Sequence, residues 1–176
     1  KGSNILMVAN FEYAGNYQGI LWFIKNVWSL LNPRNNAKLV LVGKYPKKLE
    51  KLVSDDSRIK LTGIVPMLEP YYHDACCAII PLFNDGGTKT KLIEALAFGV
   101  PIVSSPIGAK GFESASTINI SEDPHRFADH VQMLIDNQYP INELKKNKML
   151  IEKNYTWEKI GQDLNRFLTT RLFHQP

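Results

Sequence analysis

A short polar loop that opens into an apolar helix is the segment of this sequence best suited to chemistry. Residues 84–88 form the loop, and the sequence predicts a helix over residues 89–98. Lys89 and Lys91 fall in the first turn of that helix, where the helix dipole and unpaired N–H groups already carry partial positive charge. Cations are unfavourable there unless an anion lies among them. The pattern therefore predicts a site for phosphate groups.

Glu94 adds a hydrogen-bond acceptor to this segment. It follows Lys91 by three residues on the same helix face, and it is the only charged residue between Leu92 and Phe98. A lone carboxylate in so apolar a helix needs a partner, because a buried charge without one is costly. The segment thus offers cations and amides for phosphates and, one turn deeper, an acceptor for hydroxyl groups. A nucleotide sugar carries both kinds of group.

The same residues also permit a purely structural interpretation. Thr88 can serve as an ordinary helix N-cap, and the two lysines can be solvated side chains. Glu94 can then be the ion-pair partner of Lys91 at the i,i+3 spacing. The loop and helix alone do not separate this alternative from a ligand site, so the context along the chain has to decide.

The composition fits one globular domain and narrows the classes of partner. The chain has 176 residues, of which 44% are hydrophobic, so it can bury a sizeable core. Lysine and arginine outnumber aspartate and glutamate by 21 to 17, which favours anionic ligands. Basic runs with interleaved aromatic residues are missing, and we therefore expect no nucleic-acid partner.

The cysteines and the hydropathy pattern predict a cytoplasmic location. Cys76 and Cys77 are the only cysteines, and because they are adjacent they cannot form a normal disulfide framework. Reduced thiols are typical of cytoplasmic proteins. No apolar run is long enough to cross a bilayer, and no secretory signal precedes the first expected strand. The chain enters that strand almost at once, which suggests a piece of a longer protein.

Apolar runs of strand length alternate with segments of helical periodicity along most of the chain. The runs predict six strands, at residues 5–9, 39–42, 59–61, 76–80, 102–104 and 117–120. The helical segments between them cover residues 18–31, 47–53, 67–73 and 89–98, and three further helices follow at 124–136, 141–154 and 156–172. This alternation predicts an α/β fold, a Rossmann-like, doubly wound, mainly parallel six-stranded sheet with C-terminal helices. No second domain boundary is visible, so residues 1–176 are expected to form a single domain.

The terminal helices are expected to pack as a cap on the carboxyl side of the domain. The last of them carries a stripe of apolar residues at helical spacing, which predicts a buried face. This stripe consists of Trp157, Ile160, Leu164, Phe167 and Leu168.

Open parallel sheets bind ligands outside the carboxyl ends of their strands. The loops expected at that edge comprise residues 12–16, 43–44, 63–66, 84–88 and 106–111, and each contains glycine. Glycine lets the backbone approach a ligand closely, although tight strand-to-helix turns need it as well. The first of these loops brings Asn16 to the same edge as the predicted phosphate segment.

Several other chemistries lack their sequence signals. The first strand is not followed by G-x-G-x-x-G, and Lys44 stands where an NAD site needs an acidic residue. The G-x-x-x-x-G-K-[ST] loop of phosphate-binding NTPases is absent as well. The four histidines lie far apart or at spacings that do not share a helix face. No cluster of cysteines or carboxylates lies near them, so we expect no metal site.

Five segments of the chain form a recognisable pattern through their order and spacing. They read ILMVANF at 5–11, VLVG at 40–43, LTGIV at 61–65, AIIPL at 78–82 and GGTKTKLIEALAFGVPIVSS at 86–105. Together they resemble the donor-binding half of GT-B glycosyltransferases of the group 1 type, over essentially the whole chain. The resemblance implies a nucleoside-diphosphate sugar as co-substrate, no cofactor or tightly bound metal, and transfer with retention of anomeric configuration. It also implies an N-terminal acceptor-binding domain that is absent from this chain.

The resemblance assigns roles to individual residues. Glu94 matches the glutamate that accepts hydrogen bonds from ribose hydroxyls, and residues 88–91 match the segment that holds the diphosphate. The phosphate-binding set thus consists of Gly87, Thr88, Lys89, Thr90 and Lys91. The backbone near Val65 is expected to meet the edge of the base. Asn16 and Asp85 complete the predicted donor-binding residues.

Three positions depart from the family pattern. Many relatives carry a second glutamate eight residues before Glu94, near the transferred sugar, whereas this chain has Gly86 there with Asp85 beside it. A branch of the family has the Gly-Gly-Thr form, so activity is not excluded. Relatives often place an arginine after the first strand and a lysine ahead of the first helix, where this chain has Phe11 and Gln18. The two lysines at the helix start are expected to supply the missing charge, and catalytic residues stay unassigned.

The implied function is that of a glycosyltransferase of the hexosyltransferase type, active in glycan biosynthesis. The domain would bind the nucleotide sugar and, with the absent N-terminal domain, transfer the sugar to a glycan, lipid or polysaccharide intermediate. Because the active site would lie between two domains, this chain alone is expected to be inactive. Any peripheral membrane association would come through the absent domain. Two alternatives stay open: a non-catalytic nucleotide-sugar-binding or regulatory module, which Gly86 would suit, and an enzyme resembling hexose-nucleotide epimerases.

Overall fold

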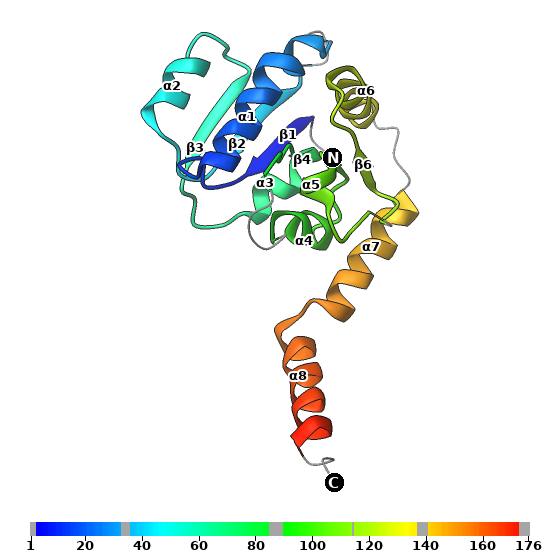
Figure 1. The fold of residues 1–176 in the computed structure, drawn as a ribbon. Coiled ribbons are helices and arrows are strands. Elements are labelled where there is room, and N and C mark those ends of the chain that lie inside the picture. The colour runs from blue at the N-terminus through cyan, green and yellow to red at the C-terminus, as the bar shows by residue number, and fades with distance from the viewer. Residues whose placement is uncertain (1–2, 33–35, 85–89, 114, 137–140, 173–176) are drawn as a thin grey trace.

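One parallel sheet organises the molecule and confirms the predicted fold class (Figure 1). The computed structural model describes residues 3–32, 36–84, 90–113, 115–136 and 141–172. Six strands lie in the order β3-β2-β1-β4-β5-β6, and every neighbouring pair is parallel. The strands are β1 Asn4–Val8, β2 Lys38–Val42, β3 Ile59–Gly63, β4 Ala75–Ile80, β5 Ile102–Ser104 and β6 Ile118–Ile120. The chain thus builds outward from β1 to β3 and then returns to extend the other side of β1.

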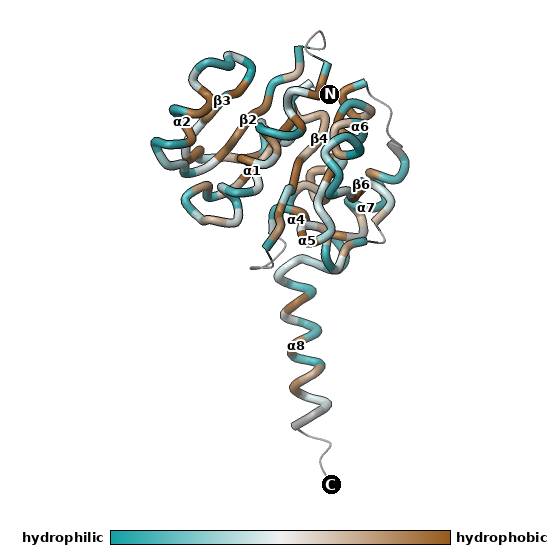
Figure 2. Tube along the Cα trace, turned by 45° about the horizontal axis from the view of Figure 1, so that its top comes forward, coloured by the Kyte–Doolittle hydropathy of each residue, from teal (hydrophilic) through white to brown (hydrophobic). Residues whose placement is uncertain are grey.

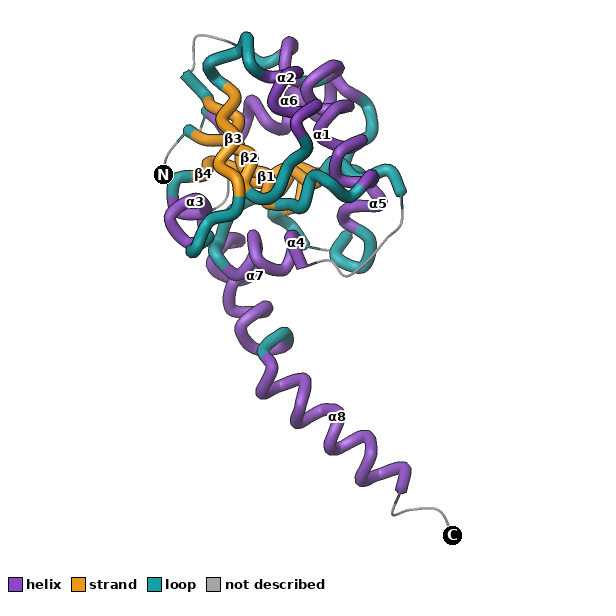
Figure 3. The backbone as a smooth tube through the Cα atoms, turned by 90° about the vertical axis from the view of Figure 1, so that its left-hand side faces the viewer, coloured by secondary structure: helices purple, strands orange, loops and turns teal. Residues whose placement is uncertain are grey.

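Helices cover both faces of the sheet. One apolar core includes residues of α1 (Ala14–Asn26), α2 (Lys47–Val53) and α6 (Pro124–Ile135). The core on the opposite face includes residues of α3 (Glu69–His73), α4 (Thr90–Ala97), α5 (Pro106–Ala109) and α7 (Ile141–Asn154). Figure 3 shows the strands between these two helical layers. Among the described helices, none is both long and apolar enough to cross a membrane.

The pleat of the strands explains why these runs are apolar throughout. In β1, Ile5 and Met7 belong to the core on the side of α1, whereas Leu6 belongs to the core on the side of α4. Leu39 and Val40 of β2 divide between the two cores in the same way. Successive side chains of a strand point to opposite faces, so a sheet covered on both sides needs an apolar residue at each position.

Two local elements differ from the sequence expectation. The first helix begins at Ala14 and ends at Asn26, and residues 28–30 form a separate 3-10 turn, η1, rather than a continuation of the helix. Residues 106–109, expected as a loop, form the short helix α5. Pro106 is compatible with that helix because the first helical N–H needs no partner. The Ser105 hydroxyl caps it by accepting a hydrogen bond from the Gly108 amide, at 3.2 Å.

The prediction that the terminal helices form a packed cap is wrong for the last of them. Helix α7 packs on the domain through the buried side chains of Leu144 and Ile151, but α8 (Trp157–Leu172) projects away from the sheet (Figure 1). Apolar and polar residues alternate along α8 in Figure 2. Trp157 is 86% exposed, and the other four members of its stripe are exposed as well. Helical periodicity predicted an apolar face but carries no information on what covers it.

Asp56 ties the 3-10 turn η1 to Arg58, the residue that precedes β3. Its carboxylate accepts hydrogen bonds from the Trp28 indole at 2.8 Å and from the Arg58 guanidinium at 2.7 and 3.0 Å. The Arg58 guanidinium also lies over the Trp28 ring, with 4.7 Å between the guanidinium carbon and the ring centroid. The hydrogen bonds from Arg58, assisted by the one from Trp28, hold the pKa of Asp56 well below its ordinary value of 3.8.

We predict that Asp56→Asn lowers the free energy of unfolding at pH 7 by about 1 kcal/mol, because the ion pair is partly solvated. A carboxyl whose pKa is depressed by folding stabilises the protein above its unfolded pKa. This contribution should therefore disappear as the pH falls from about 4 toward the lowered value. Urea denaturation at several pH values measures it, with Asp55→Asn at an exposed neighbour as the control. If the free energies of unfolding of Asp56→Asn and the parent differ by the same amount at every pH down to 2, this account is contradicted.

Candidate functional site

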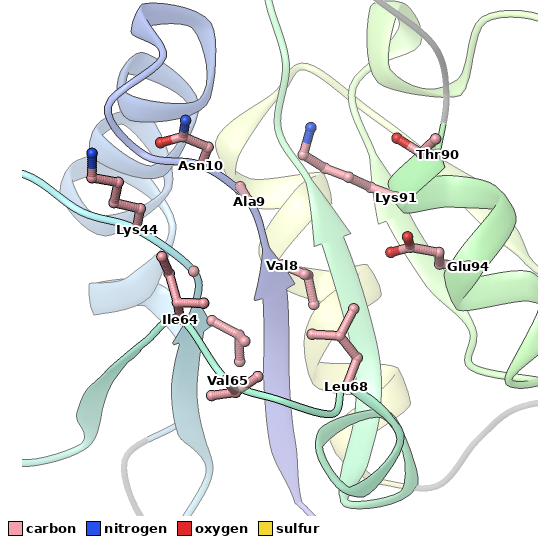
Figure 4. A pocket seen from close by; sticks show the side chains of 12 residues that line it. Val8, Ala9, Asn10, Lys44, Ile64, Val65, Leu68, Thr90, Lys91 and Glu94 are labelled. Carbon is pink, nitrogen blue, oxygen red and sulfur yellow. The ribbon is translucent and has the colours of Figure 1, made fainter.

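An open cavity of about 510 Å³ lies beyond the carboxyl ends of β1 and β2, between the loop after β3 and the start of α4 (Figure 4). This is the point at which the strand order reverses, because β1 is followed in sequence by β2 on one side and neighbours β4 on the other. Ligands of doubly wound folds bind in such a crevice. The lining residues are Val8, Ala9, Asn10, Val42, Gly43, Lys44, Ile64, Val65, Leu68, Thr90, Lys91 and Glu94.

The cavity has polar walls and an apolar end. Thr90 and Lys91 lie at the start of α4, with Glu94 one turn further along the helix, and Lys44 lies on the opposite side of the cavity, in the loop after β2 (Figure 4). Ile64, Val65 and Leu68 form the apolar end, and all three come from the segment between β3 and α3. A ligand that combines an anionic part, hydroxyl groups and a flat apolar part would find a matching surface for each.

The loops around the cavity are held together by backbone hydrogen bonds. The Phe11 amide donates to the Lys44 carbonyl at 2.7 Å, and the Gly43 amide donates to the Gly63 carbonyl at 2.9 Å. The Lys44 ammonium also pairs with the Glu12 carboxylate at 2.8 Å. The segments at the ends of β1, β2 and β3 therefore form one connected rim on this side of the cavity.

Gly43 permits the close approach of these loops. Its φ is +127°, which side chains rarely adopt, and a Cβ at this position would lie 2.0 Å from the Ala9 carbonyl oxygen. This clash cannot relax easily, because β1 and β2 are paired up to Val8 and Val42, the residues that precede Ala9 and Gly43. Glycine at this position is therefore a steric requirement of the rim rather than a result of chain flexibility.

The predicted donor-binding residues that the structure describes fall into two groups. Thr90, Lys91, Glu94 and Val65 all line the cavity. Asn16 does not, because it is buried behind the first loop, where its side-chain amide donates to the Asn10 carbonyl at 2.7 Å. The remaining predicted residues, Asp85, Gly87, Thr88 and Lys89, lie outside the described residues.

Two polar side chains that line the cavity, Asn10 and Lys44, were not among the predicted site residues. Asn10 follows the last residue of β1 by two positions, and Lys44 follows the last residue of β2 by two positions. Their place at the carboxyl edge of the sheet was the available signal.

Of the three departures from the family pattern, Gly86 lies outside the described residues. The other two have structural roles: Phe11 is buried in the core, and Gln18 accepts a hydrogen bond from the Asn84 side chain at 3.0 Å. Neither lines the cavity.

Glu94 has a partner that sequence reasoning did not identify. The Tyr72 hydroxyl, on α3, donates a hydrogen bond to its carboxylate with 3.2 Å between the oxygens. Burial and the nearby Glu94 charge raise the pKa of Tyr72, so this hydroxyl keeps its proton and acts as a donor. The carboxylate is thus oriented by Tyr72 of the neighbouring helix α3, whereas Lys91 extends into the cavity (Figure 4).

Within the described part of the chain, no group of histidine, cysteine and carboxylate side chains is arranged to hold a metal ion.

Comparisons with known proteins agree with this architecture. The profile of the family described as glycosyl transferases group 1 matches residues 2–137. A Klebsiella pneumoniae protein, described as an uncharacterized 44.6 kDa protein in the cps region, is 27% identical over 169 residues, which cover 89% of this chain and 44% of that protein. The structure of Anabaena HepE in complex with UDP has a TM-score of 0.77 at 12% identity, over 96% of this chain and 49% of HepE. A mutant of S. aureus TarM, in complex with Fondaparinux, alpha-GlcNAc-glycerol and UDP, has a TM-score of 0.74 at 19% identity, over 99% of this chain and 36% of TarM.

The parallel sheet defines a Rossmann-like α/β domain, and the likeness to the solved structures shows that its fold is of the GT-B type. With the profile match over most of its length, the chain belongs to the group 1 glycosyltransferases. It spans less than half the length of the curated relative that it matches, 44%.

We predict that Gly43→Ala destabilises the domain by about 3 kcal/mol, since it adds a backbone clash to a strained φ. Gly63→Ala is the matched control, because Gly63 also has a positive φ, +73°, but open space around its Cβ position. That variant should lose only about 1 kcal/mol. Chemical denaturation of both variants measures the difference. Equal losses would mean that the close approach to Ala9 does not constrain the rim.

Proposed function

We propose that this chain is the donor-binding domain of a glycosyltransferase and that it binds a nucleoside-diphosphate sugar in the cavity between β1 and α4. The observation that carries the proposal is the placement of Lys91 and Glu94 on one wall of a single cavity at the switch point of the sheet. A cation at a helix start suits a diphosphate, and a carboxylate one turn deeper suits ribose hydroxyls. The apolar end near Val65 suits the base.

The same geometry supports a mechanism for the leaving group. Breaking the bond between sugar and diphosphate leaves negative charge on the nucleoside diphosphate. Lys91 and the N-terminal end of α4 would stabilise that charge electrostatically. We infer that transfer of a hexosyl group proceeds in this way without a tightly bound metal and with retention of anomeric configuration. The family membership supports these finer assignments by resemblance only.

The acceptor is proposed to bind mainly to a second, N-terminal domain of the full-length protein. The chain spans 44% of its curated relative, which leaves room for such a domain. We therefore expect this chain alone to bind the donor without transferring the sugar, and the full-length protein to act on a glycan, lipid or polysaccharide intermediate. A cytoplasmic site of action is part of the proposal, and the buried cysteines Cys76 and Cys77 are compatible with it.

Glu94→Gln should weaken UDP binding about tenfold and leave the fold intact. The substitution keeps the shape of the side chain but replaces charge-assisted hydrogen bonds by weaker neutral ones. A thermal-shift panel of UDP, GDP, ADP and dTDP first identifies the preferred nucleotide, which takes the place of UDP in this and the later experiments if it is another one. Isothermal titration calorimetry with that nucleotide then measures the effect. Glu50→Gln, at an exposed position of α2, is the control. An unchanged affinity in folded Glu94→Gln would return Glu94 to a purely structural role.

Lys91→Ala should weaken UDP binding about fivefold to tenfold but leave uridine binding nearly unchanged, because the ammonium interacts with the phosphates. The salt dependence of UDP affinity should become shallower in the variant. Lys47→Ala provides a matched control, since Lys47 is an exposed lysine in the first turn of another helix, α2. If UDP and uridine lose affinity equally, Lys91 does not meet the diphosphate.

The full-length protein separates the proposed transferase from its two alternatives. Transfer of a radiolabelled sugar from the nucleotide to an acceptor supports a glycosyltransferase. Nucleotide-sugar binding without turnover would favour a regulatory module, and a change in the configuration of the free or nucleotide-bound sugar would favour an epimerase-like enzyme. Chromatographic analysis of the sugar products distinguishes the three results.

A further inference from the structure

A buried tyrosine supports the wall of the candidate site from behind. Tyr72 lies on α3 and is only 2% exposed. Its ring stacks on the Phe98 ring, with 4.7 Å between the centroids and 12° between the planes. Its hydroxyl oxygen lies 3.2 Å from Oε2 of Glu94. The stack fixes the plane of the ring, and the ring in turn fixes where the hydroxyl donates.

The packing by itself does not require the hydroxyl group. Tyr72 belongs to the apolar core on the side of α4, where a phenylalanine ring would make the same stack and fill nearly the same volume. A buried hydroxyl is unfavourable unless it has a partner. Here the partner is the carboxylate of Glu94, which also lines the ligand cavity. The hydroxyl therefore connects the core to the site.

The same short helix also reaches the apolar end of the cavity. Leu68, which precedes α3, lines the cavity, and its carbonyl accepts a hydrogen bond from the Tyr72 amide at 3.2 Å. Tyr72 is thus anchored to the segment proposed to meet the base and, through its hydroxyl, to the carboxylate proposed to meet the ribose. The distance between these two parts of the cavity is set partly by this one residue.

We propose that Tyr72 is a positioning residue for nucleotide recognition, an inference that rests on the proposed function of the cavity. Its hydroxyl engages Oε2 of Glu94 and orders the carboxylate, so that the acceptor capacity that is left is presented to the two ribose hydroxyls. An unordered glutamate side chain would have to be immobilised when the ligand binds, and that loss of freedom weakens affinity. Pre-ordering by Tyr72 removes this penalty and makes the site selective for an intact ribose.

Tyr72→Phe tests this role, because it removes only the hydroxyl and keeps the aromatic stack. Calorimetry compares UDP with 2′,3′-dideoxy-UDP, which lacks the hydroxyls that Glu94 would accept from. We expect the parent chain to prefer UDP, and Tyr72→Phe to weaken UDP binding about fivefold while binding of the dideoxy analogue stays unchanged. Tyr71→Phe is the matched control, since Tyr71 neighbours Tyr72 but does not line the nucleotide cavity. That variant should leave both affinities unchanged.

A double variant adds a second readout. If Tyr72 acts through Glu94, then Tyr72→Phe should have no further effect on UDP binding once Glu94→Gln is present. Circular dichroism and thermal unfolding confirm that each variant is folded.

The outcomes separate the failure of this inference from that of the proposed function. A parent chain that binds neither nucleotide, or binds both equally, contradicts the ribose contact of Glu94 and with it the proposed function. A parent that prefers UDP, together with a Tyr72→Phe variant that keeps the full preference, overturns the positioning role alone. An equal loss for both nucleotides would also overturn it, because that result is expected from a merely structural residue.

Discussion

Burial of both faces of the sheet is the constraint on which the rest of this structure depends. Every residue of β4 is buried, and β1 and β2 divide their side chains between two apolar cores. Strands enclosed in this way cannot hold solvated polar groups, so the side chains that could bind a ligand gather beyond the strand ends. The cavity lies there, at the carboxyl end of β1, which has β2 on one side and β4 on the other.

The polar residues that are buried near this edge support the backbone instead of facing the cavity. Asn16 holds the loop after β1 through the Asn10 carbonyl. Ser104 donates to the Ile80 carbonyl at 3.1 Å, and the Ser105 hydroxyl accepts from the Leu82 amide at 3.0 Å. Among the described residues, every buried side-chain oxygen and nitrogen has a partner. Satisfied groups of this kind make the loops a stiff support for the residues that do reach the ligand.

Helix α4 combines two chemical functions because it starts at the cavity and then runs along its wall. Its first turn presents Lys91, and the next presents Glu94, which Tyr72 orders from α3. A cation and a carboxylate so close in sequence can both serve one ligand if that ligand spreads its charge and its hydroxyls along the helix. A nucleoside diphosphate has this form, which is why the spacing of these two residues carries more weight than either residue alone.

The local features could be predicted from the sequence alone: strand and helix alternation, the bounds of α2 and α7, and the placement of Lys91 and Glu94 on one helix face. These follow from side-chain periodicity and composition, which act over a few residues. Which residues meet across the fold became visible in three dimensions. The folded chain gave Glu94 its partner Tyr72, placed Asn10 rather than Asn16 in the cavity wall, and left the apolar face of α8 exposed. Such pairings join residues distant in sequence, and a periodic pattern shows that a face or a charge needs a partner without showing which one it finds.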